Sequence, residues 1–246
     1  MAVDTGKAFS EGRRFYLDNL PLLLLITFTG SIPSFFSNVT PEGAYKNTFL
    51  FLAVIVELWA MAAVLLVAEK KSAGGVLKVT ESFDAALMKL PRFIFYSLLY
   101  ALVLLAGFIA FVIPGFYLWT KYMFVQFESL FGEKGANPFT ESSKLSKGSM
   151  MTLLVTMFLA VLAITLLTSL PELVMRVAGL FADETQYIAE LSGNVLGTAV
   201  FPWLIVSVYF IYRQLKNHQA PAAAVLDETP AEEPELLKPK RAGRKK

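Results

Sequence analysis

Long stretches of nearly uninterrupted apolar sequence constrain this chain more than any other feature. A bilayer core of about 30 Å takes about 20 apolar residues in an α-helix, and backbone in lipid must satisfy its own hydrogen bonds. Five runs have 18 to 22 residues with at most one charge each, at residues 20–37, 47–68, 93–113, 150–170 and 191–212, and residues 116–131 form a weaker sixth. The sequence therefore predicts an all-α, polytopic membrane protein with six transmembrane helices.

Composition supports this class and predicts the domain limits. Of the 246 residues, 55% are hydrophobic and 17% are charged, whereas soluble domains average about 25% charged residues. We expect residues 1–217 to form a six-helix integral membrane domain. After His218 the chain becomes rich in Ala and Pro, then acidic, and then basic. Residues 218–246 are thus predicted to be a disordered cytoplasmic tail with a basic end.

Missing residue types exclude several kinds of chemistry. The chain has no cysteine, and its one histidine, His218, follows the last apolar run. Disulfides, thiolate nucleophiles and Cys-ligated metals are excluded, as are histidine-based metal sites or triads inside the membrane. No serine–base or paired-acid motif is present either. We therefore expect no catalytic residue, no cofactor and no metal site, and the chain is predicted not to be an enzyme.

Basic residues are unevenly distributed between the segments that connect the six runs. In the six-span arrangement, 19 of the 22 lysines and arginines fall on one side, Lys46 and Arg176 fall on the other, and Lys121 lies within the sixth run. The positive-inside rule then places both termini in the cytoplasm of a prokaryotic cell, with the protein in its inner membrane. Omitting residues 116–131 alone would break the alternation, so the charges also favour a crossing by this weakest run.

Similar segments recur before each outward-going run. Residues 9–11, 80–83 and 140–143 each contain a glutamate beside serine or threonine, and the three tryptophans, Trp59, Trp119 and Trp203, each fall in an inward-going run. The pattern predicts three helix-pair units, each preceded by an amphipathic cytoplasmic elbow helix. In residues 80–90, Phe83, Leu87 and Leu90 share one face by helical spacing, as expected of a helix at the membrane surface.

Two short motifs and one terminal pair carry a resemblance to a known group. The motifs are Ile113-Pro114-Gly115-Phe116-Tyr117-Leu118 and Ser142-x-x-Leu145-x-x-Gly148, and Tyr212-Arg213 follows the last run. The chain resembles the glycerophosphoryl diester phosphodiesterase membrane domain and the related YciC-like (UPF0259) and DUF975-like families of multispanning prokaryotic membrane proteins. Pro138-Phe139 replaces the Ala-Leu pair usual before the serine. The resemblance implies a six-helix domain and supplies no mechanism.

Few ionisable or amide side chains interrupt the apolar runs, and Glu57, Lys121 and Gln126 form the candidate polar site. Glu57 lies near the predicted midplane, where a charge costs about 2.5–3.5 kcal/mol on insertion scales. It is interpreted as a neutral acid bonded to a neighbouring helix, as the partner of Lys121, or as a proton or substrate site. Interfacial solvation is expected for Glu128. Gly193 and Gly197 predict a close-packing helix face.

These observations favour a non-enzymatic scaffold or accessory subunit. The alternative is a transporter or channel for a small or amphiphilic solute that uses a polar site around Glu57 and Lys121. Expected partners are the lipid bilayer, a membrane protein, and anionic lipid headgroups at the basic tail, with no specific nucleic acid. The orientation of Glu57 distinguishes the two hypotheses, because a solvated cavity that it lines together with Lys121 and Gln126 would favour transport, and tight packing around it would favour a scaffold.

Overall fold

The computed structural model describes residues 3–133, 135–179 and 183–226, and all the regular elements in these ranges are α-helices. The all-α class is therefore confirmed. The helices are α1 (Thr5–Asp18), α2 (Leu20–Val39), α3 (Ala44–Ser72), α4 (Val79–Ala110), α5 (Val112–Tyr122), α6 (Val125–Phe131), α7 (Pro138–Ser146), α8 (Met150–Val177) and α9 (Asp183–Leu226). By length and composition, α2, α3, α4, α8 and α9 suffice to cross a membrane, as expected of a multi-pass membrane protein.

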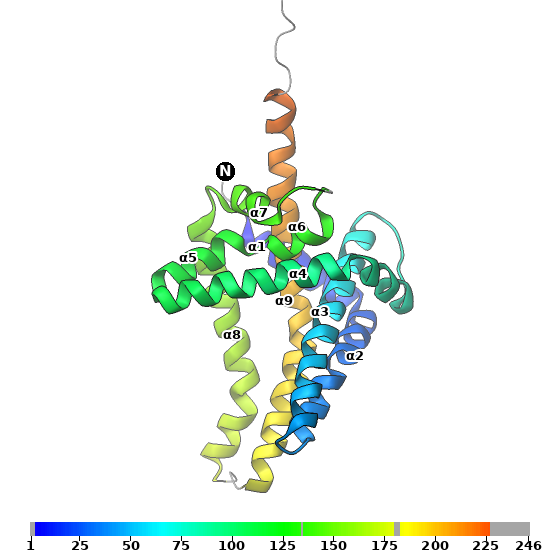
Figure 1. Ribbon diagram of the computed structural model, residues 1–246, viewed down its shortest axis with the longest axis vertical. Helices are drawn as coiled ribbons and strands as arrows, with labels where there is room; N and C mark the ends of the chain where they lie inside the picture. Colours follow the sequence, from blue (N-terminus) through cyan, green and yellow to red (C-terminus); the bar gives the residue numbers. More distant parts are fainter. Residues whose placement is uncertain (1–2, 134, 180–182, 227–246) are drawn as a thin grey trace, which may run out of the picture.

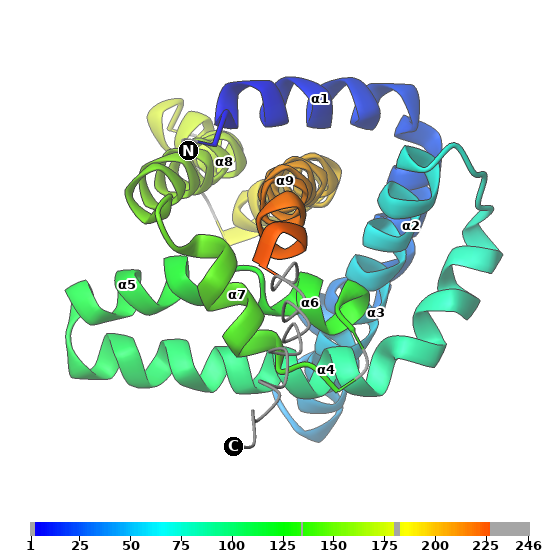
Figure 2. The same cartoon turned by 90° about the horizontal axis from the view of Figure 1, so that it is seen from above.

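Four of these long helices lie along the long axis of the molecule, and one does not. The four axial helices are α2, α3, α8 and α9, whereas α4 runs across them (Figure 1). Seen from above, α2, α3, α8 and α9 are viewed roughly end-on, whereas α1, α4 and α5 are seen from the side (Figure 2). Helix α9 contacts α1, α2, α3 and α8, so it is the central helix of the molecule.

The weakest predicted span is not a single helix. Residues 116–131 are divided between α5, which ends at Tyr122, and α6, which begins at Val125. The turn between α4 and α5 lies at Phe111, whose backbone is extended, and not at Pro114-Gly115. Six spanning helices are therefore not confirmed, because 11-residue and 7-residue helices are too short to cross a bilayer.

Side chains of α7 stabilise the break between α5 and α6. The Ser142 hydroxyl accepts a hydrogen bond from the Phe124 N–H at 3.1 Å and donates to the Lys121 carbonyl at 3.2 Å. Ser146 donates to the carbonyls of Thr120 and Lys121, each at 3.1 Å. Both serines are buried, so they supply partners for backbone groups that leave the helix where water is absent. The serine motif found in the sequence therefore has a structural role in redirecting the chain.

The three segments predicted as elbows take different forms. The first is within α1 and the third within α7, whereas the second is continuous with α4 across Pro91. Each contains or directly follows a phenylalanine that contacts an aromatic ring of another helix. The pairs are Phe9 with Trp203 at 5.9 Å, Phe83 with Trp59 at 5.1 Å and Phe139 with Tyr122 at 5.1 Å. The three-unit repeat stays a prediction, although every segment contacts the second helix of a pair.

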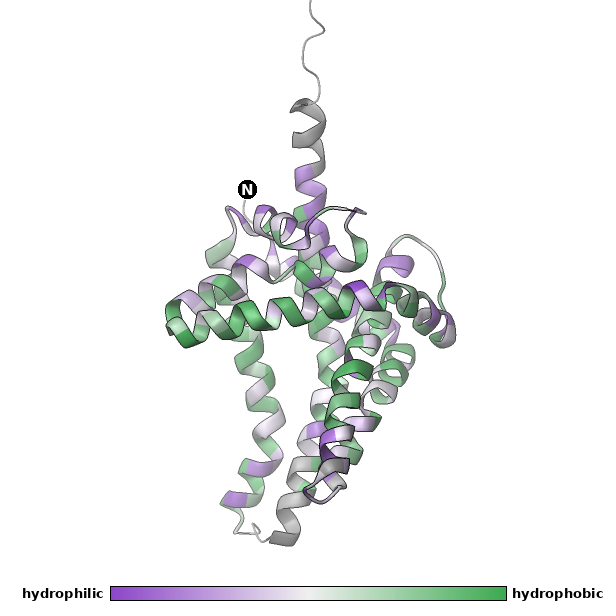
Figure 3. Cartoon of the chain, viewed as in Figure 1, coloured by the Kyte–Doolittle hydropathy of each residue, from purple (hydrophilic) through white to green (hydrophobic). Residues whose placement is uncertain are grey.

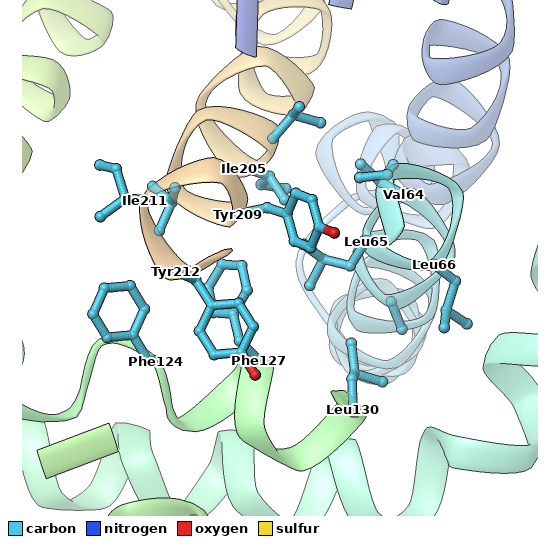
Figure 4. Close-up of a cluster of buried hydrophobic side chains, with 14 of the residues drawn as sticks. Val64, Leu65, Leu66, Phe124, Phe127, Leu130, Ile205, Tyr209, Ile211 and Tyr212 are labelled. Atoms are coloured by element: carbon cyan, nitrogen blue, oxygen red, sulfur yellow. The ribbon is translucent and has the colours of Figure 1, made fainter. Parts of the chain in front are cut away.

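The buried hydrophobic cluster lies at one end of the axial helices, where α1 and α4–α7 are also located. We call this end of the molecule the basic end. Figure 4 shows the central part of the cluster, where Leu65 of α3, Leu130 of α6 and the rings of Tyr209 and Tyr212 of α9 come together. Lys46 and Arg176 are the described basic residues at the opposite end. Helix α9 continues to Leu226, past the predicted domain boundary after residue 217, and residues 227–246 lie outside the described part.

Replacing Gly12 tests the close approach of α1 to α9. A Cβ atom at residue 12 would lie 2.8 Å from the Ser207 Cα, so Gly12→Ala is expected to lower the free energy of unfolding by about 1–3 kcal/mol. The measurement is thermal unfolding in mild detergent. Gly6→Ala on the same helix is the control, because its Cβ would lie 3.5 Å from the Asp4 Oδ1. Equal midpoints for the two variants would contradict this packing.

Replacing Ser142 tests the break between α5 and α6. Ser142→Ala removes the partner of the Phe124 N–H, and we expect a loss of about 1–3 kcal/mol because a buried donor is left unpaired. Hydrogen exchange at the Phe124 amide should also become faster. Ser143→Ala, at a partly exposed neighbouring position, should leave both measurements near those of the parent. Unchanged protection of Phe124 in Ser142→Ala would refute the assigned role.

Candidate functional site

A cavity of about 660 Å³ lies between the four axial helices. Its walls are residues 27–38 of α2, 57–61 of α3, 164–172 of α8 and 193–205 of α9. These segments lie away from the basic end. Nine of the 17 lining residues carry polar side chains: Thr27, Ser31, Asn38, Glu57, Thr168, Ser169, Glu172, Asn194 and Thr198. A cavity with this lining can hold a solute that is at least partly polar.

Glu57 occupies a central position in this polar region. It lies halfway along α3, and its carboxylate accepts a hydrogen bond from the Ser34 hydroxyl of α2. It also lines a second cavity, of about 620 Å³, that shares Asn38, Asn194 and Thr198 with the first. The carboxylate therefore faces cavities that are lined by residues of α2, α3 and α9, and it is not enclosed by packed side chains.

Helical hydrogen bonding makes the cavity rich in acceptors. The hydroxyls of Thr27, Ser31 and Thr168 donate to carbonyls of their own helices at 2.9, 3.0 and 3.1 Å. Their protons are committed to these bonds, so the oxygens offer lone pairs to a ligand.

The charges around the cavity are mainly negative. Glu57 and Glu172 are the ionisable residues in the lining. Glu172 already has a cationic partner, because the Arg176 guanidinium donates to its carboxylate at 2.7 and 3.0 Å. Among the described residues, no lysine or arginine forms an ion pair with Glu57. Glu57 thus remains available to a ligand that donates hydrogen bonds or carries positive charge.

Packed side chains close the cavity toward the basic end. Its lining ends at Met61 and Ile205, and the buried cluster of Figure 4 begins at their level. Deeper in that end, Glu128 is 1% exposed and accepts hydrogen bonds from Tyr212 Oη at 3.0 Å and from Lys216 Nζ at 2.6 Å. The expectation that Glu128 is solvated is therefore wrong, because α6 turns its carboxylate inward toward α9.

The other two residues of the predicted polar site lie away from Glu57. The Lys121 ammonium lies 5.5 Å from the Tyr117 ring centre and 5.2 Å from that of Tyr122. Gln126 donates from Nε2 to the Ser97 hydroxyl at 3.2 Å. Neither lines the cavity around Glu57. The break after α5 is the reason, since it places both residues on the elements that lie across the axial helices.

Gly193 and Gly197 lie where α9 approaches α8. A Cβ at residue 193 would lie 2.8 Å from the Thr168 carbonyl oxygen, and one at residue 197 would lie 3.6 Å from the Thr168 Cγ2. Both glycines also line the cavity. The small residues therefore bring two walls together at the level of the polar side chains, and a larger residue at 193 would force these walls apart.

Most of the polar lining was not identified from the sequence. Its signal is the spacing of polar residues inside apolar runs: Thr27, Ser31, Ser34 and Asn38 follow one another at four, three and four residues. Such positions share one face of a helix. In α9, Asn194 and Thr198 repeat the four-residue step. Hydropathy averages conceal this pattern because the surrounding residues are strongly apolar.

Metal chemistry and known relatives add no further assignment. Within the described ranges, no three histidine, cysteine or acidic side chains gather as metal ligands would. Comparisons with family models, curated proteins and solved structures give no match to this chain. The resemblance carried by residues 113–118 and 142–148 stays a prediction, and the cavity is the feature of the structure that bears on function.

Proposed function

We propose that this chain is a non-catalytic membrane protein of transporter type that binds a small amphiphilic amine, in its protonated form, between the four axial helices. The observation that carries the proposal is the position of Glu57, which lines both cavities and has no cationic partner among the described residues. An ammonium group can donate to the carboxylate and to neighbouring oxygens. The apolar part of the solute would contact Phe201, Ile164 and Met61.

The lining supports a donor ligand over an acceptor ligand. Carboxylates and back-bonded hydroxyls accept hydrogen bonds. A solute that carries hydrogen-bond donors can pair with these groups, whereas an anionic or acceptor-rich solute cannot. Asn38 and Asn194 are the amide donors of the lining, and they can serve a hydroxyl or carbonyl elsewhere on the same solute.

The cavity changes the balance between the two functions considered from the sequence. The sequence favours a scaffold because the candidate polar site that it offers for a solute pathway consists of only Glu57, Lys121 and Gln126. The structure surrounds Glu57 with polar residues from all four axial helices, although Lys121 and Gln126 are not among them. Binding of a solute is therefore the better supported proposal, and a scaffold or accessory role is what remains if no solute binds.

The proposed setting is a prokaryotic cytoplasmic membrane, with the basic end on the cytoplasmic side. Charge distribution supports this orientation, and it places the cavity in the outward half of the protein. The packed cluster at the basic end would then separate the solute from the cytoplasm. We infer that the described arrangement is an outward-facing state, in which α9 and α3 must move to release the solute inward.

A binding assay with a fluorescent amine tests the site directly. The purified protein in detergent is titrated with dansylcadaverine, which combines a primary amine and an apolar ring, and binding is followed by fluorescence. Glu57→Gln should weaken binding about tenfold or more, because a hydrogen bond to a charged group contributes about 1.5–3 kcal/mol. The substitution keeps the shape of the side chain and an oxygen that can accept from Ser34.

Two controls make this result specific. Glu141→Gln removes one surface carboxylate that pairs with Lys144 and should leave the affinity unchanged. Dansylamide, which lacks the basic alkyl amine, should bind the parent protein weakly and should not distinguish Glu57→Gln from it. If dansylcadaverine binds parent and Glu57→Gln equally, or binds neither, the amine-binding function is wrong.

A further inference from the structure

We propose that the α4–α5 hairpin, residues 93–122, does not cross the membrane but lies within the leaflet at the basic end, with lipid acyl chains covering its apolar surface. This inference is independent of the solute-binding proposal. It assigns a partner, the acyl chains of one leaflet, to a surface that the described protein leaves uncovered. It also replaces two of the six predicted crossings by one element in the plane of the membrane.

The direction of α4 is the first observation. Figures 1 and 2 both show α4 and α5 running across the axial helices, near the basic end. If the axial helices cross the bilayer, a helix at this orientation lies along its plane. Residues 93–110 of α4 extend over about 27 Å at 1.5 Å per residue. The hairpin therefore reaches well beyond the axial helices on one side of the molecule.

The surface of the hairpin is the second observation. Leu98, Leu102, Leu105 and Ile109 follow one another at helical spacing along α4, and all are at least half exposed. At the tip, Phe111 is 77% exposed. Soluble proteins rarely leave so large an apolar patch in water. Residues 93–120 contain no charged side chain, so no part of this surface is suited to aqueous contact.

Charged and aromatic residues at the base of the hairpin mark a membrane interface. Arg92 immediately precedes the uncharged stretch and Lys121 follows it. The Arg92 guanidinium lies 6.0 Å from the Tyr96 ring centre, and Lys121 lies between the rings of Tyr117 and Tyr122. Tyrosines and basic residues are typical of the level of the lipid headgroups. Figure 3 shows the same boundary, with apolar α4 and α5 beneath the more polar α7.

A groove beside the hairpin fits the proposed partner. It lies between α5 and α8, has a volume of about 570 Å³, and is lined almost entirely by apolar side chains, including Phe116, Met151, Val155 and Phe158. The groove lies next to Tyr117, which we place at the headgroup level, so the groove lies at the depth where the acyl chains of this leaflet begin. Lipid is therefore the occupant that matches the lining, the depth and the uncharged surface together.

The distribution of basic residues is compatible with this arrangement. The sequence prediction required a crossing by residues 116–131 because omitting one span reverses every later loop. Omitting two consecutive spans restores the alternation, and the connection between them, at Phe111, carries no charge. The positive-inside rule therefore cannot distinguish a crossing pair of helices from a hairpin that stays in one leaflet.

Single cysteines test the position of the hairpin, because the parent chain has none. Phe111→Cys is compared with Glu42→Cys, in the α2–α3 connection, and with the exposed Lys147→Cys before α8. The variants are reconstituted in vesicles of phosphatidylethanolamine and phosphatidylglycerol and treated with a membrane-impermeant maleimide. Glu42→Cys should react from one side only and Lys147→Cys from the other. Phe111→Cys should react from neither side until detergent is added.

Depth measurements on two further variants complete the test. Bimane labels on Leu98→Cys and on Ile109→Cys should show the same ratio of quenching by two lipids whose nitroxides lie at different depths, because α4 lies in the plane and both sites are at one depth. In a crossing helix these sites would differ in depth by about 16 Å. Thermal unfolding in detergent verifies that each labelled variant is folded.

Three results would overturn the inference. Reaction of Phe111→Cys from the side that labels Glu42→Cys would show that the hairpin crosses the membrane. Reaction from the side of Lys147→Cys without detergent would place the tip in water. Absence of quenching at both α4 sites, together with a disulfide between two copies of Leu98→Cys, would show that a second copy of the chain covers this face.

Discussion

The architecture depends on the requirement that backbone groups be hydrogen-bonded wherever water is excluded. A helix satisfies this requirement by itself, so any break must be supplied with partners from elsewhere. At the break around Met123 the partner is the Ser142 hydroxyl, which accepts from the Phe124 N–H and donates to the Lys121 carbonyl. With that serine in place, α5 can end after 11 residues and the chain can turn into α6. The end of α5 therefore depends on this local satisfaction of polar groups.

The same arrangement explains why one half of the protein is filled and the other is hollow. At the basic end, α1 and α6 insert aromatic and aliphatic side chains between the axial helices, and the core cluster forms there. At the opposite end no comparable element is described, and small residues such as Gly30 and Gly193 line the walls. Four helices without filling residues leave space between them. The cavity is thus a consequence of where the connecting helices lie, and its polarity is an additional property set by Ser31, Asn194 and Thr198.

Sequence reasoning predicts helices well here because the signal is local. Apolar runs of about 20 residues indicate where the long helices lie, and α2, α3, α8 and α9 each contain one of the predicted runs, although α8 and α9 extend beyond theirs. The direction of a helix in space is not a local property. Residues 93–120 lack the charges on which orientation rules depend, so the sequence does not determine the direction of this part of α4. For the site, Glu57 was found because a carboxylate in an apolar run is conspicuous. Identifying its polar neighbours on α2 requires comparing the helical spacing of hydroxyl and amide side chains in several helices together.

The polar lining is difficult to explain by stability alone. A carboxylate near the middle of a spanning helix costs about 2.5–3.5 kcal/mol, and one hydrogen bond to a charged group returns about 1.5–3 kcal/mol. On these figures the single bond from Ser34 offsets part of the cost of Glu57. By contrast, Glu128 has two donors, Tyr212 and Lys216, and is fully buried by them. The protein thus gives Glu128 two donors, one of them a cation, and gives Glu57 a single hydroxyl donor, which is the distribution expected if a ligand supplies a further donor to Glu57.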